Sequence, residues 1–265
     1  MTSQQLANSI RRSALHMVHK ANASHIGSCL SIADIVAVLY ADFLRIDPTQ
    51  PKKPERDRFV LSKGHAGVAV YAALAHRGFF DVSQLEDYGT DGSQLMAHIS
   101  HKILGVEFST GSLGHGLPFG VGKAKSLQMQ GSHSRTVVLL SDGELDEGSN
   151  WEAMMFAAHH KLNNLIAIVD YNKLQSLSSV ENTLGLEPLR AKFEAFGWYC
   201  IEVQGHDHFA MLEALQRPAG SEQPKMILAH TTKGKGVSYM ENQVAWHYRS
   251  PNAELLAQAL SELEG

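Results

Sequence analysis

The chain has 265 residues, of which 44% are hydrophobic and 19% charged, and a formal net charge of −4. This length is enough to bury a large core, and the interspersed charges, which form no basic run, argue against a nucleic-acid or membrane-surface partner. Cys29 and Cys200 lack metal-ligand spacing, and with neither a signal peptide nor a membrane-spanning run apparent, we expect a cytoplasmic protein.

The amino-terminal part of the chain predicts two helices joined by a polar loop. Residues 4–20 have apolar side chains at amphipathic helical spacing. The loop that follows contains His25, and Ser31 with Asp34 three positions later predicts that a second helix begins at Ile32 and continues to about Leu44.

A short strand is predicted at 58–61, and the sequence Ser-Lys-Gly-His, ending in His65, follows it. A helix is expected at 67–77, followed by an irregular segment at 79–110 that contains His98. Long irregular segments in compact domains are often functional. The glycine-rich stretch from 109 to 124 allows backbone amides to approach a ligand closely, and the start of the helix after it would favour an anion.

The stretch from 136 to 176 predicts a β-α-β unit. Its apolar runs at 137–140 and 165–169 are continuous, as in strands buried on both faces of a parallel sheet. Between them, Ser149 and Glu152 have capping-box spacing and predict the start of a helix.

Polar residues follow both strands of this unit. Asp142 comes after the first strand and Asn172 after the second. A right-handed crossover between parallel strands places these ends on one edge of the sheet. With the carbonyl of Leu174, the two side chains form a plausible magnesium site. The alternative is that these residues only form turns, since Asp, Asn and Gly are common turn formers.

Two more strands, 199–203 and 226–229, and a terminal helix at 252–264 complete the prediction. Several strand ends carry polar or glycine-rich loops, as expected where open α/β sheets bind ligands. We therefore predict one domain, 1–265, with an α/β doubly wound, mostly parallel sheet and helices on both faces.

Three motifs resemble those of the transketolase family. Asp-Gly-x-x-x-Glu-Gly-x-x-Trp-Glu-Ala followed by Asn-Lys-Leu is similar to the family's thiamine diphosphate signature, and DRFVLSKGHA and TGSLGHG resemble two further motifs. The resemblance implies the diphosphate-binding type of the thiamine diphosphate fold. It also implies Mg²⁺, or another divalent cation such as Ca²⁺ or Mn²⁺, on Asp142, Asn172 and Leu174. The cofactor contacts it implies are His65, Gly111, Ser112, Leu113, Gly143, Glu144, Asn172 and His247.

The resemblance also implies catalytic residues. His25, His98 and His247 match histidines suited to proton transfer at substrate hydroxyls near pH 7. Glu147 matches a glutamate that links active sites across the dimer, although an acid beside a helix start also stabilises the helix dipole. The departures from the family pattern are Ile26, Ile99, His115, Ser141 and Tyr248.

The resemblance covers nearly the whole chain, but not the pyrimidine-binding and C-terminal domains of a full transketolase. It implies the N-terminal subunit of a split transketolase, assembled as α2β2 with a C-terminal subunit. The reaction expected is transfer of a two-carbon ketol unit from a ketose phosphate, or a similar anionic ketose, to an aldose phosphate. Two alternatives stay open: an α-type subunit of another thiamine-dependent enzyme, such as a 2-oxo acid dehydrogenase, and a non-catalytic regulatory homologue.

Overall fold

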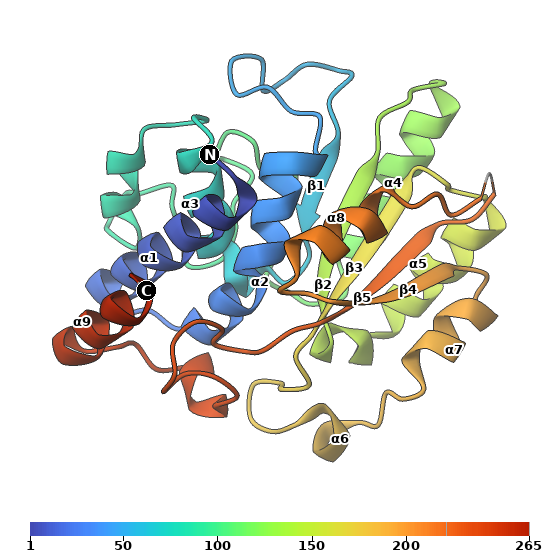
Figure 1. Ribbon diagram of the computed structural model, residues 1–265. Coiled ribbons are helices and arrows are strands. Elements are labelled where there is room, and N and C mark those ends of the chain that lie inside the picture. The colour runs from blue at the N-terminus through green and yellow to red at the C-terminus, as the bar shows by residue number, and fades with distance from the viewer. Residues whose placement is uncertain (221, 265) are drawn as a thin grey trace.

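The computed structural model describes residues 1–220 and 222–264. At its centre is a five-stranded sheet in the order β1-β2-β3-β5-β4 (Figure 1), in which every neighbouring pair is parallel. The strands are β1 (Arg58–Leu61), β2 (Thr136–Ser141), β3 (Leu165–Tyr171), β4 (Tyr199–Gln204) and β5 (Lys225–His230). Each predicted strand is confirmed to within two residues at either end.

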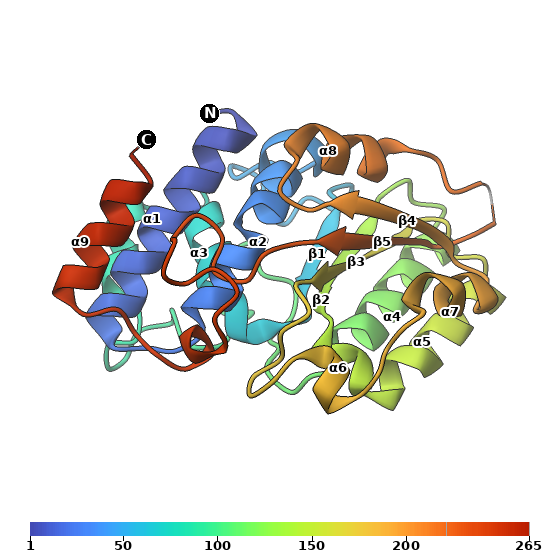
Figure 2. The same ribbon diagram turned by 60° about the horizontal axis from the view of Figure 1, so that its bottom comes forward.

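Helices cover both faces of the sheet, because alternate side chains of each strand enter two separate cores. Val137 and Leu139 contribute to one core, and Val138 and Leu140 to the other. The first core includes residues of α1 (Ser3–Ala21), α2 (Ile26–Val38), α3 (Gly67–His76) and α8 (His208–Gln216). The second includes residues of α4 (Gly116–Met129), α5 (Gly148–His159) and α7 (Leu189–Ala195). Figure 2 shows α8 above the sheet and α4, α5 and α7 below it, so the doubly wound α/β prediction is confirmed.

Short helical turns and two further helices, α6 and α9, complete the described chain. They are η1 (Leu39–Phe43), η2 (Gly64–Ala66), η3 (Val82–Asp87), η4 (Gly143–Asp146), α6 (Val180–Thr183), η5 (Val244–His247) and α9 (Ala253–Glu262). The segment 79–110 has only one 3-10 turn, η3, and is otherwise irregular, as predicted.

The predicted start of the second helix is wrong. The helix α2 begins at Ile26, after His25 in a left-handed conformation with φ of 75°. Ser31 therefore lies inside the helix, and its hydroxyl donates to Asp170 of β3 at 2.6 Å instead of capping. A contact with a residue far along the chain has replaced the local capping pattern.

The predicted capping box of α5 is also wrong. This helix has Glu147 at its N-cap and already includes Ser149. The Ser149 hydroxyl donates to the carbonyl of Gly114 at 2.6 Å. Gly114 has φ of 81°, and a Cβ there would lie 2.5 Å from the Ser149 hydroxyl oxygen. The close approach thus requires glycine at this point of the TGSLGHG motif.

One prediction about apolar runs needs correction. Residues Ile26–Phe43, which span α2 and η1, are long and apolar enough to cross a membrane by length and composition. However, 89% of this window is buried inside the domain. Such burial is what a core helix of a folded domain shows, because its apolar surface is already covered by protein.

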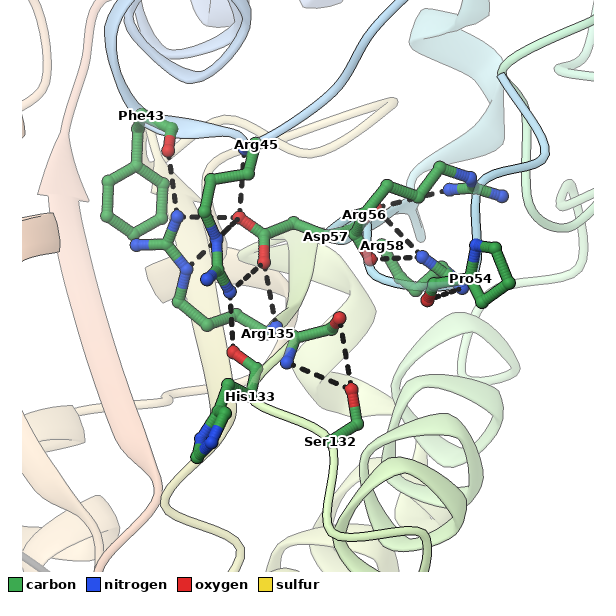
Figure 3. Close-up of polar contacts among 10 residues, drawn as sticks. Phe43, Arg45, Pro54, Arg56, Asp57, Arg58, Ser132, His133 and Arg135 are labelled. Carbon is green, nitrogen blue, oxygen red and sulfur yellow. Dashed lines mark hydrogen bonds and ion pairs between the residues drawn. The ribbon is translucent and has the colours of Figure 1, made fainter. Parts of the chain in front are cut away.

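An ionic network anchors the amino end of the sheet (Figure 3). The buried carboxylate of Asp57 accepts hydrogen bonds from Arg135 Nη2 at 2.6 Å and Arg45 Nη2 at 2.9 Å, and from the backbone N–H groups of both arginines. The Arg135 guanidinium also lies 3.8 Å from the ring centroid of Phe43. Burial opposes ionisation, but these donors hold the pKa of Asp57 below its ordinary value. The network fixes β1 and β2 at the edge opposite the candidate site.

Candidate active site

A cavity of about 230 Å³ lies at the carboxyl ends of four strands. The residues just after these strands form much of its wall: Lys63 and His65 after β1, Asp142 after β2, Asn172 after β3 and Lys233 after β5. This is the edge where parallel α/β sheets bind ligands, because loops diverge there and leave a crevice.

Most of the predicted site residues line this one cavity. They come from segments far apart in the sequence and are His25, His65, His98, Gly111, Leu113, Asp142, Gly143, Asn172, Leu174 and His247. Among the residues that the structure describes, the cavity wall also includes Lys63 and Lys233, which the sequence analysis did not single out. Both lysines lie in polar loops that follow strand ends, and this position in the sequence could have identified them as candidates for the site.

Three predicted residues do not line the cavity. Ser112 and Glu147 are exposed. Glu144 is fully buried behind the wall, where its carboxylate accepts hydrogen bonds from Ser62 Oγ at 2.5 Å and from the Gly114 amide at 2.9 Å. In this structure Glu144 therefore joins the loops after β1 and β2 to the glycine-rich turn. Contacts of these three residues with cofactor or partner stay predictions.

Four histidines face one another in the cavity. The His25 ring centroid lies 5.2 Å from that of His65, 5.7 Å from that of His98 and 5.0 Å from that of His247. The backbone N–H of His25 also donates to the His247 carbonyl at 2.7 Å. This bond ties the start of α2 to η5, so two segments separated by most of the chain present their imidazoles together.

Burial keeps three of these imidazoles neutral at pH 7. Burial, followed by the charges of His98 and Lys233, lowers the pKa of His25 to about 4. Burial, followed by the charges of Lys233 and His25, lowers the pKa of His247 to about 3. Burial, followed by the charge of Lys63, also lowers the pKa of His65 well below its ordinary value. Neutral rings can accept or donate a proton, which is the requirement for acid–base chemistry.

The oxygen atoms of the predicted metal site are held together by backbone hydrogen bonds. One Asp142 carboxylate oxygen accepts from the N–H of Lys173 at 2.6 Å, which links the ends of β2 and β3. Lys173 has φ of 65°, an unfavourable conformation for a non-glycine residue. Asn172 Oδ1 accepts from the N–H of Leu174 at 3.0 Å. Burial, together with the negative charge of Asp170, raises the pKa of Asp142 to about 7.

The donor set fits a hard divalent cation. A carboxylate, a side-chain amide oxygen and a backbone carbonyl are the oxygen ligands that Mg²⁺, Ca²⁺ and Mn²⁺ take. A cation here would offset the cost of a buried Asp142 carboxylate. Within the described ranges no cluster of three or more His, Cys, Asp or Glu side chains could hold a metal.

A buried ion pair lies next to the predicted metal ligands. Lys63 Nζ lies 2.5 Å from Asp170 Oδ2, with side-chain exposures of 1% and 0%. Asp170 also accepts from the Asn172 amide at 3.0 Å, which orients the Asn172 side chain. Burial alone would raise the pKa of Asp170, but the Lys63 ammonium and the hydroxyls of Ser31 and Thr231 lower it below its ordinary value.

Lys233 connects the loop after β5 to the same wall. Its ammonium donates to the carbonyls of Leu174 and Gln175, both at 3.0 Å, and lies 3.1 Å from Nδ1 of His247. A carbonyl oxygen has two lone pairs, so Leu174 can serve both Lys233 and a cation. Burial, and then the charge of Lys63, lowers the pKa of Lys233 to about 8. The cavity thus combines two buried ammonium groups with a cluster of oxygen ligands, a setting suited to a phosphorylated ligand.

Comparison with known proteins identifies the family. The family model described as "Transketolase, thiamine diphosphate binding domain" matches residues 2–263. The chain belongs to the transketolase family. The matching model describes the thiamine diphosphate binding domain of the family, which agrees with the predicted cofactor.

Two curated transketolase relatives match along nearly their whole length. An apulose-4-phosphate transketolase subunit of Phocaeicola vulgatus is 40% identical over 96% of this chain and 90% of that protein. The 6-deoxy-6-sulfo-D-fructose transketolase subunit SqwG of a Clostridium species is 40% identical over 98% of this chain and 96% of that protein.

Solved transketolases share the fold of this chain but are much longer. The crystal structure of transketolase from Campylobacter jejuni superposes with a TM-score of 0.93 and 32% identity, over 99% of this chain and 42% of that one. Human transketolase is 37% identical over 97% of this chain and 41% of that protein. The chain therefore spans about two fifths of these longer family members.

Proposed function

We propose that this chain is the N-terminal, cofactor-binding subunit of a two-subunit transketolase. The observation that carries the proposal is that proteins named as transketolase subunits match it over 90% and 96% of their own length, whereas full transketolases are covered over about two fifths. A partner with the pyrimidine-binding and C-terminal domains would complete the site, in an α2β2 assembly. The free, buried Cys29 and Cys200 support a cytoplasmic location for it.

The first task of the chain is to hold the cofactor. Thiamine diphosphate supplies, when bound, a nucleophilic carbon that cleaves and re-forms bonds next to a carbonyl group. In our proposal Asp142, Asn172 and the Leu174 carbonyl hold a divalent cation against the diphosphate. Lys63 and Lys233 provide further positive charge beside them, and their burial strengthens each electrostatic contact.

The second task is to move protons at substrate hydroxyls. Because His247 Nδ1 faces the Lys233 ammonium at 3.1 Å, Nδ1 accepts a hydrogen bond and the proton of the neutral ring resides on Nε2. His247 is thus set to donate from Nε2 to a substrate oxygen. His25 is a neutral imidazole within the same cluster and would serve as the proton acceptor. His98 lies across from His25 and completes the set.

The alternatives are less well supported. The matching family model is that of transketolase, which favours ketol transfer over 2-oxo acid dehydrogenation. The histidines and oxygen ligands converge on one cavity, and a regulatory homologue would not need that arrangement. The two relatives are named for different sugars, one phosphorylated and one sulfonated. The donor ketose proposed for this chain is therefore a phosphorylated or similarly anionic sugar.

Reconstitution of activity tests this proposal. Ketol transfer from xylulose 5-phosphate to ribose 5-phosphate, and from a sulfonated and a branched ketose, is measured with Mg²⁺ and thiamine diphosphate. We expect no transfer by the purified chain and transfer once a polypeptide with the pyrimidine-binding and C-terminal domains is added. Transfer by the chain alone would contradict the two-subunit proposal, and transfer of none of these ketoses by the mixture would contradict the proposed reaction.

A further inference from the structure

Behind the cavity wall, a second group of polar side chains surrounds Asp34 on α2. Asp34 is 6% exposed, and its carboxylate is paired with Arg11 of α1, at 3.0 Å for Nη1 and 2.5 Å for Nη2. His206 Nδ1 lies 2.6 Å from one of its oxygens, and His208 Nε2 lies 3.0 Å from the other. None of these four residues lines the cavity, and the proposed mechanism does not use them.

His206 connects this group to the loop after β5. Its Nε2 accepts a hydrogen bond from the backbone N–H of Thr232 at 2.8 Å. A backbone N–H can only donate, so the proton of the neutral ring lies on Nδ1 and is donated to Asp34. Arg11 fixes the Asp34 carboxylate through two hydrogen bonds. The His206 ring, bonded to this carboxylate on one side and to the Thr232 amide on the other, therefore links α2 to the loop after β5.

The Thr232 amide lies between two residues that support the cofactor site. On one side, the Thr231 hydroxyl donates to Asp170, whose carboxylate orients Asn172. On the other side, Lys233 donates to the carbonyl of Leu174. A shift of this amide would therefore move two supports of the proposed metal ligands together.

We propose that His206 is a positioning residue, which sets the loop 231–236 in the conformation that supports the metal and diphosphate site. The cofactor part of this inference rests on the proposed function. The effect on the loop does not, because the hydrogen bond from Thr232 to His206 joins two groups of this chain. Outer hydrogen bonds of this kind orient the groups that touch a metal and influence its affinity.

His208 provides a matched control. Like His206 it donates to the Asp34 carboxylate. Among the residues that the structure describes, however, its buried Nδ1 has no hydrogen-bond partner, and it makes no bond to the loop after β5. Replacing either histidine removes one donor from Asp34. Only replacement of His206 also removes the acceptor of the Thr232 amide.

The test compares His206→Leu, His206→Gln and His208→Leu. Amide hydrogen exchange over 231–236 is measured in the full chain, and Mg²⁺-dependent thiamine diphosphate affinity is measured with the partner subunit present. We expect His206→Leu to raise loop exchange and to weaken cofactor affinity, each by about tenfold. His208→Leu should stay within about twofold. His206→Gln, whose amide oxygen can accept from Thr232, should recover part of both losses.

Several results would overturn the inference. Unchanged loop exchange in His206→Leu, or equal changes in His206→Leu and His208→Leu, would show that the bond to Thr232 does not position the loop. Failure of the unmodified chain with its partner subunit to bind thiamine diphosphate would instead contradict the proposed function, and the exchange data would still judge the role of His206 in the loop. Should His206→Leu not fold, His206→Ala against His208→Ala gives the same comparison, because alanine also lacks an acceptor for the Thr232 amide.

Discussion

The buried ion pair between Lys63 and Asp170 leads to a stability prediction that can be worked out from the structure. Replacing Lys63 by Met keeps the shape of the side chain but leaves a carboxylate that is 0% exposed without its counter-ion. Breaking a buried pair by removing one partner costs about 3–5 kcal/mol. Asp170 keeps hydrogen bonds from Ser31, Thr231 and Asn172, so we expect the lower end, about 3 kcal/mol.

In a domain of this size, each kcal/mol lowers Tm by about 2–4 °C, so Lys63→Met should lower Tm by about 6–12 °C. Urea and thermal unfolding of the purified chain, followed by circular dichroism at pH 7, measure the change. Adding Asp170→Asn removes the uncompensated charge. The double variant should therefore be more stable than the sum of the two single losses implies, by about 2 kcal/mol.

A matched control is Lys161→Met. Its ammonium lies 2.8 Å from Glu222, but both side chains are more than half exposed, at 58% and 63%. Exposed pairs contribute little, so this substitution should change stability by less than about 1 kcal/mol. Similar losses for Lys63→Met and Lys161→Met, or strictly additive losses with Asp170→Asn, would refute the argument from burial.

Two further predictions concern pH. The pKa of His247 falls to about 3 in the folded state, against about 6.5 in the unfolded chain, so the unfolded chain binds more protons between these values and the free energy of unfolding falls as pH falls. In urea titrations over this acid range, His247→Asn should reduce the slope of stability against pH by up to about 1.4 kcal/mol per pH unit. An unchanged slope would contradict this prediction. The lowered pKa of Asp57 contributes stability above about pH 4 that is lost as pH falls through its folded value. Asp57→Asn should therefore be less stable than the unmodified chain by about 2 kcal/mol at pH 7, and a gap that does not narrow as pH falls below about 4 would count against this account.

The strands could be predicted from the sequence because their signals are local. Each buried strand is an apolar run that ends in turn or polar residues, and a fully parallel sheet leaves no alternation to mislead the assignment. The start of α2 could not be predicted in this way. Ser31 has the local pattern of a cap, but its hydroxyl is used by Asp170, 139 residues further along.

Much of the site followed from the same logic. Asp142 and Asn172 were predicted to converge because parallel neighbouring strands end on one edge, and β2 and β3 are neighbours in the sheet. The supporting contacts were not predictable. Asp170 lies within an apolar strand, and its partner Lys63 is 107 residues away. The insertion of β5 between β3 and β4, which brings Lys233 to the cavity, also depends on the sheet order and not on any local motif.

The most direct test of the account is thiamine diphosphate binding with and without Mg²⁺. The unmodified chain, with its partner subunit, is compared by calorimetry with Asp142→Ala and with Asp146→Ala, which removes an exposed carboxylate from the same turn. The account predicts that Mg²⁺-dependent binding is lost in Asp142→Ala and kept in Asp146→Ala. Unchanged binding by Asp142→Ala would contradict the assignment of the oxygen cluster at the ends of β2 and β3 as the metal and diphosphate site.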